Sequence, residues 1–221
     1  MNTLSDILPA NIHIRIPELT PLMTDINQCV AYNKYASDPV KLHEYVQIYQ
    51  SLIGIKQGIV IDLGSGTCNF VIALSQNFPN LNFVCYENSP AMIKIATDNI
   101  TLARLNSKIQ LIQDDVFNAT GKYDVVLANR LLHHMDETKE FWKLIKSLGE
   151  NVLVVDINRP PKYVVDHIRE NDEYQEDVYK EDLISSLQAA YSLEEVTEQT
   201  KEYNYTITTD DNYKLFVYHT K

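Results

Sequence analysis

Positive charge is scarce in this sequence. Its 19 lysine and arginine residues are outnumbered by 30 aspartate and glutamate residues, which leaves a formal net charge of −11 at pH 7. A protein that binds nucleic acid needs a basic surface to meet the phosphate backbone. We therefore expect no nucleic-acid partner.

Long hydrophobic runs are also missing. No apolar stretch approaches the ~20 residues that a helix needs to cross a bilayer, and the first residues lack the basic and apolar regions of a secretory signal. The three cysteines, Cys29, Cys68 and Cys85, do not have the spacing of a metal site. These absences predict reduced thiols, a cytoplasmic location, no membrane partner and no bound metal.

Internal repeats and low-complexity linkers are absent too, so the 221 residues most simply form one domain with a sizeable core. We expect an N-terminal helical arm or cap over residues 1–55, packed on a core over residues 56–221. Within that core, residues 159–180 are predicted to form a segment on the substrate side. The chain could also be part of a larger multidomain protein or a homodimer.

The stretch GIVIDLGSGTCNF, residues 58–70, organises the core. Its apolar first half predicts a strand that is covered on both faces. Gly64 and Gly66 then allow positive φ angles and the close approach of a ligand. Thr67 is expected to cap a helix over residues 68–78. A strand, a glycine turn and a helix in this order place free N–H groups beside a ligand.

Acidic residues follow three of the predicted strands. Asp62 lies two residues before the first glycine, and Glu87 ends the next strand, 21 residues after Gly66. Asp114 and Asp115 end a third strand. This spacing suits a strand–turn–helix–strand unit that brings a carboxylate to a ribose. Ligands bind at the carboxyl edge of open α/β sheets, so these side chains mark the predicted site.

Strands and helices alternate along the core with short connections, which predicts parallel strands and right-handed crossovers. The expected strands cover residues 59–63, 82–86, 109–113, 123–128 and 151–156. Two further strands are expected at residues 193–199 and 213–219. Because no helix fits between them, they should form an antiparallel hairpin.

Four segments together resemble the class I S-adenosylmethionine-dependent methyltransferases: IDLGSGTCN, FVCYENSPAMIKIA, LIQDDVFN and YDVVLANRLLHHM. They cover about half of the chain in the order and spacing of that family. The resemblance implies an α/β fold, a doubly wound, seven-stranded, mostly parallel sheet with an antiparallel last strand. One departure is Cys68, which stands where the family usually has a third glycine.

The resemblance also implies a site for S-adenosyl-L-methionine, with S-adenosylhomocysteine as product. Asp62 would orient the glycine loop and meet the cofactor's ammonium group, and Glu87 would accept hydrogen bonds from the ribose hydroxyls. Asp115 matches the position that recognises adenine, and Asp114 is the alternative in register. The expected cofactor-binding residues are Tyr35, Asp62, Leu63, Gly64, Ser65, Gly66, Glu87, Asn88, Asp114, Asp115, Val116, Asn129, Arg130 and Leu131.

On the substrate side the resemblance points His133 toward the pocket, with His134 packed or solvated. His133 is the base available for an acceptor that must lose a proton. Arg130 and Arg159 each follow a strand at the ligand edge and could together bind a substrate carboxylate. Either arginine could instead neutralise a nearby aspartate. Tyr32 is a further candidate for substrate contact.

The sequence therefore predicts a methyltransferase that acts on a small molecule or peptide. O-methylation is preferred, for example of a carboxylate in natural-product biosynthesis. Three alternatives stay open: N-methylation of a small amine, a nicotinamide-dependent oxidoreductase, and a non-catalytic S-adenosylmethionine-binding module of a larger protein.

Overall fold

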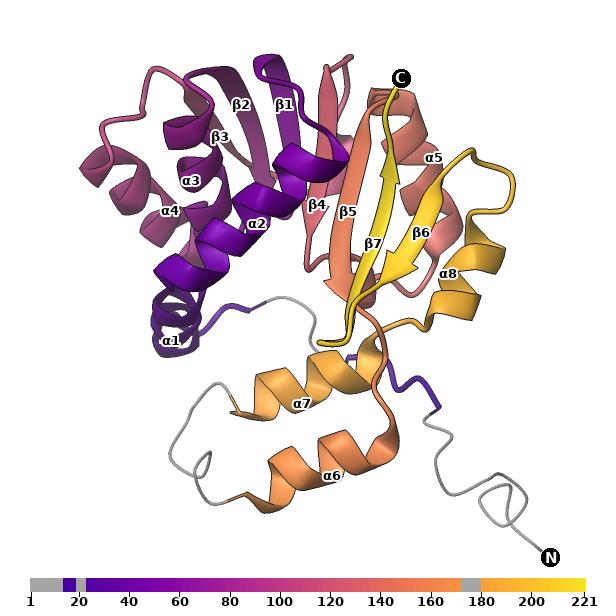
Figure 1. Ribbon diagram of the computed structural model, residues 1–221. Coiled ribbons are helices and arrows are strands. Elements are labelled where there is room, and N and C mark those ends of the chain that lie inside the picture. The colour runs from indigo at the N-terminus through magenta and orange to yellow at the C-terminus, as the bar shows by residue number, and fades with distance from the viewer. Residues whose placement is uncertain (1–13, 19–22, 172–179) are drawn as a thin grey trace, which may run out of the picture.

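The computed structural model describes residues 14–18, 23–171 and 180–221. The chain forms a seven-stranded sheet in the order β3-β2-β1-β4-β5-β7-β6 (Figure 1). The strands are β1 (Gln57–Leu63), β2 (Asn80–Glu87), β3 (Ile109–Gln113), β4 (Val125–Asn129), β5 (Val152–Ile157), β6 (Thr206–Thr209) and β7 (Lys214–His219). The first five strands pair in parallel, and β7 runs antiparallel to both of its neighbours. This confirms the predicted sheet with one antiparallel strand.

Helices cover both faces of the sheet. They are α1 (Ile26–Ala36), α2 (Pro39–Leu52), α3 (Asn69–Asn77), α4 (Pro90–Leu102), α5 (Thr138–Leu148), α6 (Lys162–Glu170), α7 (Lys180–Ala189) and α8 (Leu193–Gln199). One buried core joins the sheet to α2, α3 and α4, and a second joins it to α5 and α8. Helices α6 and α7 lie beyond the carboxyl ends of the parallel strands (Figure 1). No helix in the described part of the chain is long and apolar enough to cross a membrane.

The N-terminal helical region has clear local start signals. The Asp25 side chain accepts from two N–H groups at the start of α1, and Asp38 does the same for α2, where Pro39 is the first helical residue. Both helices lie within residues 1–55, where a helical arm or cap was expected. Residues 1–13 and 19–22 of the predicted N-terminal arm, and residues 172–179 of the predicted substrate-side segment, lie outside the described residues.

The predicted strand at residues 193–199 is wrong. These residues form helix α8, because Ser192 and Glu195 make a reciprocal capping box that satisfies N–H groups at the helix start. Val196 is the buried residue of this helix. The strand that pairs with β7 is instead β6, so the predicted antiparallel hairpin exists with a shorter connection.

Candidate functional site

The glycine loop between β1 and α3 is held in left-handed backbone conformations. Gly64 has φ +71°, and a Cβ atom there would lie 2.8 Å from a methyl carbon of Leu131. Cys68 has φ 60° and is the residue that precedes α3, with no side-chain cap. The prediction that Thr67 caps this helix is therefore wrong. A left-handed turn explains why glycine is common in the family at the position of Cys68.

Helix α1 is tied to this loop by amide side chains. Asn69 Nδ2 donates to both Asn33 Oδ1 and Thr67 Oγ1, each at 2.8 Å. From α4, Asn99 Nδ2 donates to Asn33 Oδ1 and to the Thr67 carbonyl, both at 2.9 Å. These bonds hold the N-terminal helical region against the turn.

Asp62, one residue before the end of β1, is a buried carboxyl group. Its Oδ1 atom has no hydrogen-bond partner among the described residues. Burial, together with the nearby charge of Glu87, raises the pKa of Asp62 to about 7. An unsatisfied, buried carboxylate of this kind is suited to a cationic ligand.

Glu87 ends β2 and joins the glycine loop to the start of α4. Its Oε2 accepts from the Gly66 N–H at 2.9 Å, and its Oε1 accepts from the Ser89 N–H at 2.7 Å. Burial raises the pKa of Glu87, although these N–H groups act in the opposite direction. The carboxylate is therefore fixed in orientation at the carboxyl edge of the sheet.

A cavity of about 720 Å³ opens at this edge. It is lined by residues from the glycine loop, three strand ends, α1, α7 and the N-terminal arm. Among the predicted site residues, its lining includes Tyr32, Gly64, Gly66, Glu87, Asn88, Asp115, Val116, Asn129, Arg130, Leu131 and His133. A smaller cavity of about 40 Å³ is lined in part by Tyr32, Tyr35, Asp62, Gly64, Ser65, Asn129 and Arg130.

The two acidic residues after β3 have different surroundings. Asp115 lines the large cavity. Asp114 is used in the turn, where its Oδ1 accepts from Asn118 Nδ2 at 2.7 Å and from the Asp115 N–H at 2.8 Å. Of the two alternatives in register, the structure thus brings Asp115 to the cavity. Leu63 is fully buried in the core and lines neither cavity.

The predicted arginine pair is not brought together. Arg159 donates to the Ala190 carbonyl at 3.1 Å and to Glu195 Oε1 at 2.9 Å, and it lines neither cavity. Its side chain joins the end of β5 to α8, because Glu195 lies next to it in the fold. Arg130 lines both cavities. The proposed carboxylate clamp is therefore corrected to a single arginine.

His133 forms a buried pair with Asp156 from the end of β5. Its Nδ1 lies 2.6 Å from Asp156 Oδ1, and its main-chain N–H donates to Oδ2 at 3.2 Å. Burial lowers the pKa of His133 more than the nearby carboxylate raises it. Burial would raise the pKa of Asp156, but His133 and the Ile157 N–H offset this and lower it. The pair thus holds a neutral imidazole beside a carboxylate, with the Nδ1 proton donated to Asp156 and a lone pair at Nε2.

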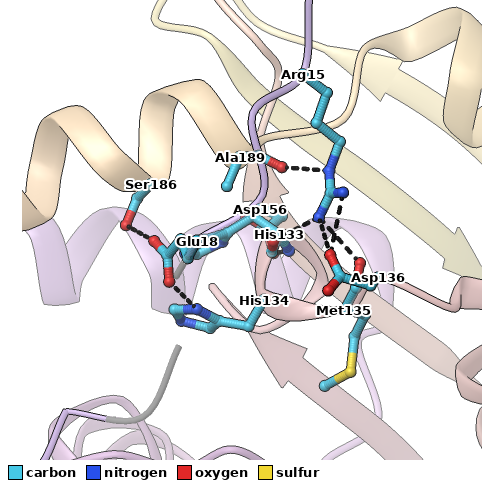
Figure 2. Close-up of polar contacts among 9 residues, drawn as sticks. All are labelled: Arg15, Glu18, His133, His134, Met135, Asp136, Asp156, Ser186 and Ala189. Carbon is cyan, nitrogen blue, oxygen red and sulfur yellow. Dashed lines mark hydrogen bonds and ion pairs between the residues drawn. The ribbon is translucent and has the colours of Figure 1, made fainter. Parts of the chain in front are cut away.

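His134 forms a second pair of the same kind, which the sequence did not predict. Its Nδ1 lies 2.6 Å from Glu18 Oε2, and Ser186 Oγ donates to Glu18 Oε1 at 3.0 Å (Figure 2). The rings of His133 and His134 are 4.0 Å apart between centroids. His134 was expected to be packed or solvated, and it is instead paired with a carboxylate at the cavity wall.

Arg15 holds this part of the arm in place, and sequence analysis missed it. Its guanidinium donates to the carbonyls of Ala189, His133 and Met135 at 2.8–3.1 Å. It also pairs with Asp136 at 3.3 Å, as Figure 2 shows. Nothing local in the sequence signals this contact, because its partners lie more than 100 positions away.

Comparisons with known proteins agree with this geometry. The family model described as a methyltransferase domain matches residues 61–150. Ribosomal RNA small subunit methyltransferase C from Pseudoalteromonas translucida (strain TAC 125) is 34% identical over 79 residues. That alignment covers 36% of this chain and 23% of the relative, so the match spans less than a quarter of the relative's length.

Solved structures share the fold at low identity. A SAM-dependent methyltransferase from Aquifex aeolicus has a TM-score of 0.65 at 15% identity, covering 89% of this chain and 98% of that one. The plantazolicin methyltransferase BpumL, in complex with a pentazolic desmethylPZN analogue and SAH, has a TM-score of 0.60 at 18% identity. That match covers 86% of this chain and 90% of the other.

The residues of the site fit S-adenosylmethionine by their chemistry. The unpaired Asp62 Oδ1 suits its ammonium group, and the Glu87 carboxylate at the cavity wall suits the ribose hydroxyls. Asp115 lines the same cavity. Residues 61–150 thus match a methyltransferase domain, and the seven-stranded fold is shared with solved S-adenosylmethionine-dependent methyltransferases.

Proposed function

We propose that this chain transfers a methyl group from S-adenosylmethionine to an oxygen atom of a small molecule or peptide. The observation that carries the proposal is the large cavity, which has Glu87 and Asp115 on its wall together with His133 and His134. One cavity thus contains groups for the cofactor and groups for an acceptor.

The cofactor residues have separate proposed tasks. Asp62 binds the ammonium group, Glu87 binds the ribose hydroxyls, and Asp115 with Asn88 contacts the adenine. The loop from Gly64 to Gly66 lets the cofactor lie against the main chain, because neither glycine carries a Cβ atom. The bound cofactor supplies a methyl group that its sulfonium charge has already activated.

The protein's remaining task is to hold the acceptor in line and to exclude water, which can contribute roughly 7–11 kcal/mol. His133 is the residue we assign to the acceptor's proton, since its Nε2 lone pair remains after Nδ1 is bound to Asp156. An acceptor with an ionisable O–H group makes use of that lone pair. With Arg159 held by Glu195, a carboxylate acceptor would have only Arg130 from the predicted pair.

A role in natural-product biosynthesis is part of this proposal. Its support is the shared fold with the plantazolicin methyltransferase and with an O-methyltransferase family protein from Burkholderia thailandensis. The cavity of about 720 Å³ is large enough for a cofactor and a small acceptor.

Calorimetric titration with S-adenosylhomocysteine tests the cofactor assignment. Glu87→Gln should weaken binding by roughly 10- to 100-fold, because hydrogen bonds to a charged group contribute about 1.5–3 kcal/mol. Glu140→Gln is the matched control, since Glu140 is exposed on α5 and pairs only with Lys143 among the ion pairs of the described residues. If the wild type does not bind S-adenosylhomocysteine and binds NAD, the proposal is overturned in favour of the oxidoreductase.

A further inference from the structure

Three groups that can ligate a metal ion meet at the wall of the large cavity. Glu18, His133 and His134 each offer one ligand atom, and these atoms all lie within 4.8 Å of one another. Glu18 comes from the N-terminal arm, and the histidines come from the 3₁₀ turn η3 (Leu132–His134) after β4. All three residues line the cavity.

Neighbouring side chains hold these residues in fixed orientations. Asp156 holds His133 through Nδ1 at 2.6 Å, which directs the Nε2 lone pair away from the carboxylate. Metal-binding histidines commonly donate their second ring N–H to a carboxylate in this way. Ser186 orients Glu18 from α7, and the Glu18 side chain is only 8% exposed.

The arm is anchored on the side away from the cavity. Arg15 binds the carbonyl of His133 within the turn and that of Met135 directly after it, and its guanidinium lies 4.2 Å from the ring centroid of Tyr191. Three residues further on, Glu18 reaches His134 (Figure 2). The Arg15 contacts thus fix Glu18 and the two histidines relative to one another.

We propose that Glu18, His133 and His134 bind a divalent transition-metal ion of the zinc type, with an open coordination position toward the cavity. Two histidines and one carboxylate are a frequent ligand set for Zn²⁺ in sites that leave a fourth position free. The same set also suits Fe²⁺. Calcium or magnesium would instead require mostly oxygen ligands.

Binding requires only small movements of these side chains. Zn²⁺ takes nitrogen and oxygen ligands at about 2.0–2.2 Å in a tetrahedron, so its ligand atoms lie about 3.3 Å apart. Without an ion, Glu18 and His134 share a hydrogen bond at 2.6 Å. The ion takes the place of that hydrogen bond: the His134 ring proton moves from Nδ1 to Nε2 by exchange with solvent, so that the Nδ1 lone pair and the Glu18 carboxylate can both bind the ion.

The role of the ion in methyl transfer rests on the proposed function. An acceptor R–OH binds through oxygen at the open position and loses its proton to solvent, because the metal lowers the pKa of a bound hydroxyl. The R–O⁻ oxygen then forms the new O–CH₃ bond as the S–CH₃ bond breaks, leaving S-adenosylhomocysteine. With the metal bound, His133 holds the ion that acidifies the acceptor's hydroxyl group. It does not itself accept the proton.

Titration of the EDTA-treated full chain with CoCl₂ tests the site, because four-coordinate Co²⁺ has visible absorption bands. We expect one equivalent to bind the wild type with these bands. His134→Ala should abolish them, and the near-isosteric Glu18→Gln should weaken binding at least 10-fold. His167→Ala is the matched control on α6 and should bind as the wild type does, since His167 is exposed and lies outside the cavity linings.

Unchanged affinity for S-adenosylhomocysteine shows that each variant is folded. Absence of the bands in the wild type, or their survival in His134→Ala, would overturn the metal site. Methyl transfer is tested separately: EDTA treatment should stop turnover, and Zn²⁺ should restore it. Full turnover by the metal-free chain would overturn the metal's catalytic role and leave His133 as the base, with the proposed methyl transfer intact.

Discussion

The proposed cofactor end and the proposed acceptor end of the cavity are built in different ways. At the cofactor end, Asp62, Gly66 and Glu87 come from one strand–turn–helix–strand unit, in which Gly66 and Glu87 are hydrogen-bonded at a separation of 21 positions. At the acceptor end, Glu18 and His134 are 116 positions apart. The first arrangement is determined largely by local chain geometry, and the second exists only once the sheet has formed.

This difference has an energetic counterpart. The cofactor end rests on hydrogen bonds from main-chain N–H groups to the Glu87 carboxylate and on left-handed turn residues beside the central strands. The acceptor end rests on a short arm held by side chains, chiefly those of Arg15 and Glu18. We therefore expect changes at the acceptor end to alter chemistry with little effect on cofactor binding.

His133→Ala should show the largest difference between the effect on turnover and the effect on cofactor affinity. Turnover of an acceptor should fall by about 10²- to 10⁴-fold, the usual contribution of a group that removes a proton. Affinity for S-adenosylhomocysteine should change by less than about 2-fold, because His133 lies among the acceptor-side groups. Steady-state kinetics and calorimetry on the same preparation measure both values, and a matching loss of affinity would contradict the division into two ends.

The same division explains which features could be predicted from the sequence. Asp38-Pro39 and Ser89-Pro90 mark the starts of α2 and α4 through contacts within a single turn, so both starts can be recognised from the sequence. Glu87 was placed at the ligand edge because spacing along a strand–turn–helix–strand unit is nearly constant. These signals lie within a few residues or one supersecondary unit.

The remaining features depend on packing between distant segments. Arg159 does follow a strand at the ligand edge, but Glu195 on α8 draws its side chain away from the cavity. Recognising that helix was possible in principle, because Ser192 and Glu195 have the spacing of a capping box. Glu18 has no comparable signal, since its partners His134 and Ser186 are brought to it only by the tertiary fold.

Asp62→Asn should have the next largest effect, through the pH dependence of stability. Burial raises the pKa of Asp62 from 3.8 to about 7, so the folded state keeps its proton at pH values where the unfolded state has lost it. This group therefore lowers the free energy of unfolding as pH rises from about 4 to 7, by up to about 4 kcal/mol. Urea unfolding at pH 5 and pH 8 measures this effect. The free energy of unfolding should fall less between the two pH values in Asp62→Asn than in the wild type.

Cofactor binding provides a second measure of the same group. An ammonium group beside Asp62 favours the ionised carboxylate, so binding near pH 6 should release a proton. Calorimetry with S-adenosylhomocysteine in buffers of different ionisation enthalpy detects that release. Equal proton release by wild type and Asp62→Asn would show that another group accounts for it.

Arg15→Ala should have the smallest effect on stability and is the most direct test of the arm. The Asp136 partner is 69% exposed, so that ion pair contributes at most about 1 kcal/mol to the free energy of unfolding. The three carbonyls that Arg15 binds connect the arm to the histidine turn and to α7, and their loss frees Glu18 to move away from His134. We expect a several-fold loss of turnover with cofactor affinity unchanged. Arg169→Ala, which removes an exposed arginine from α6, is the matched control. If Arg15→Ala keeps wild-type turnover, the arm does not position Glu18, and the acceptor end must be held by η3 and α7 alone.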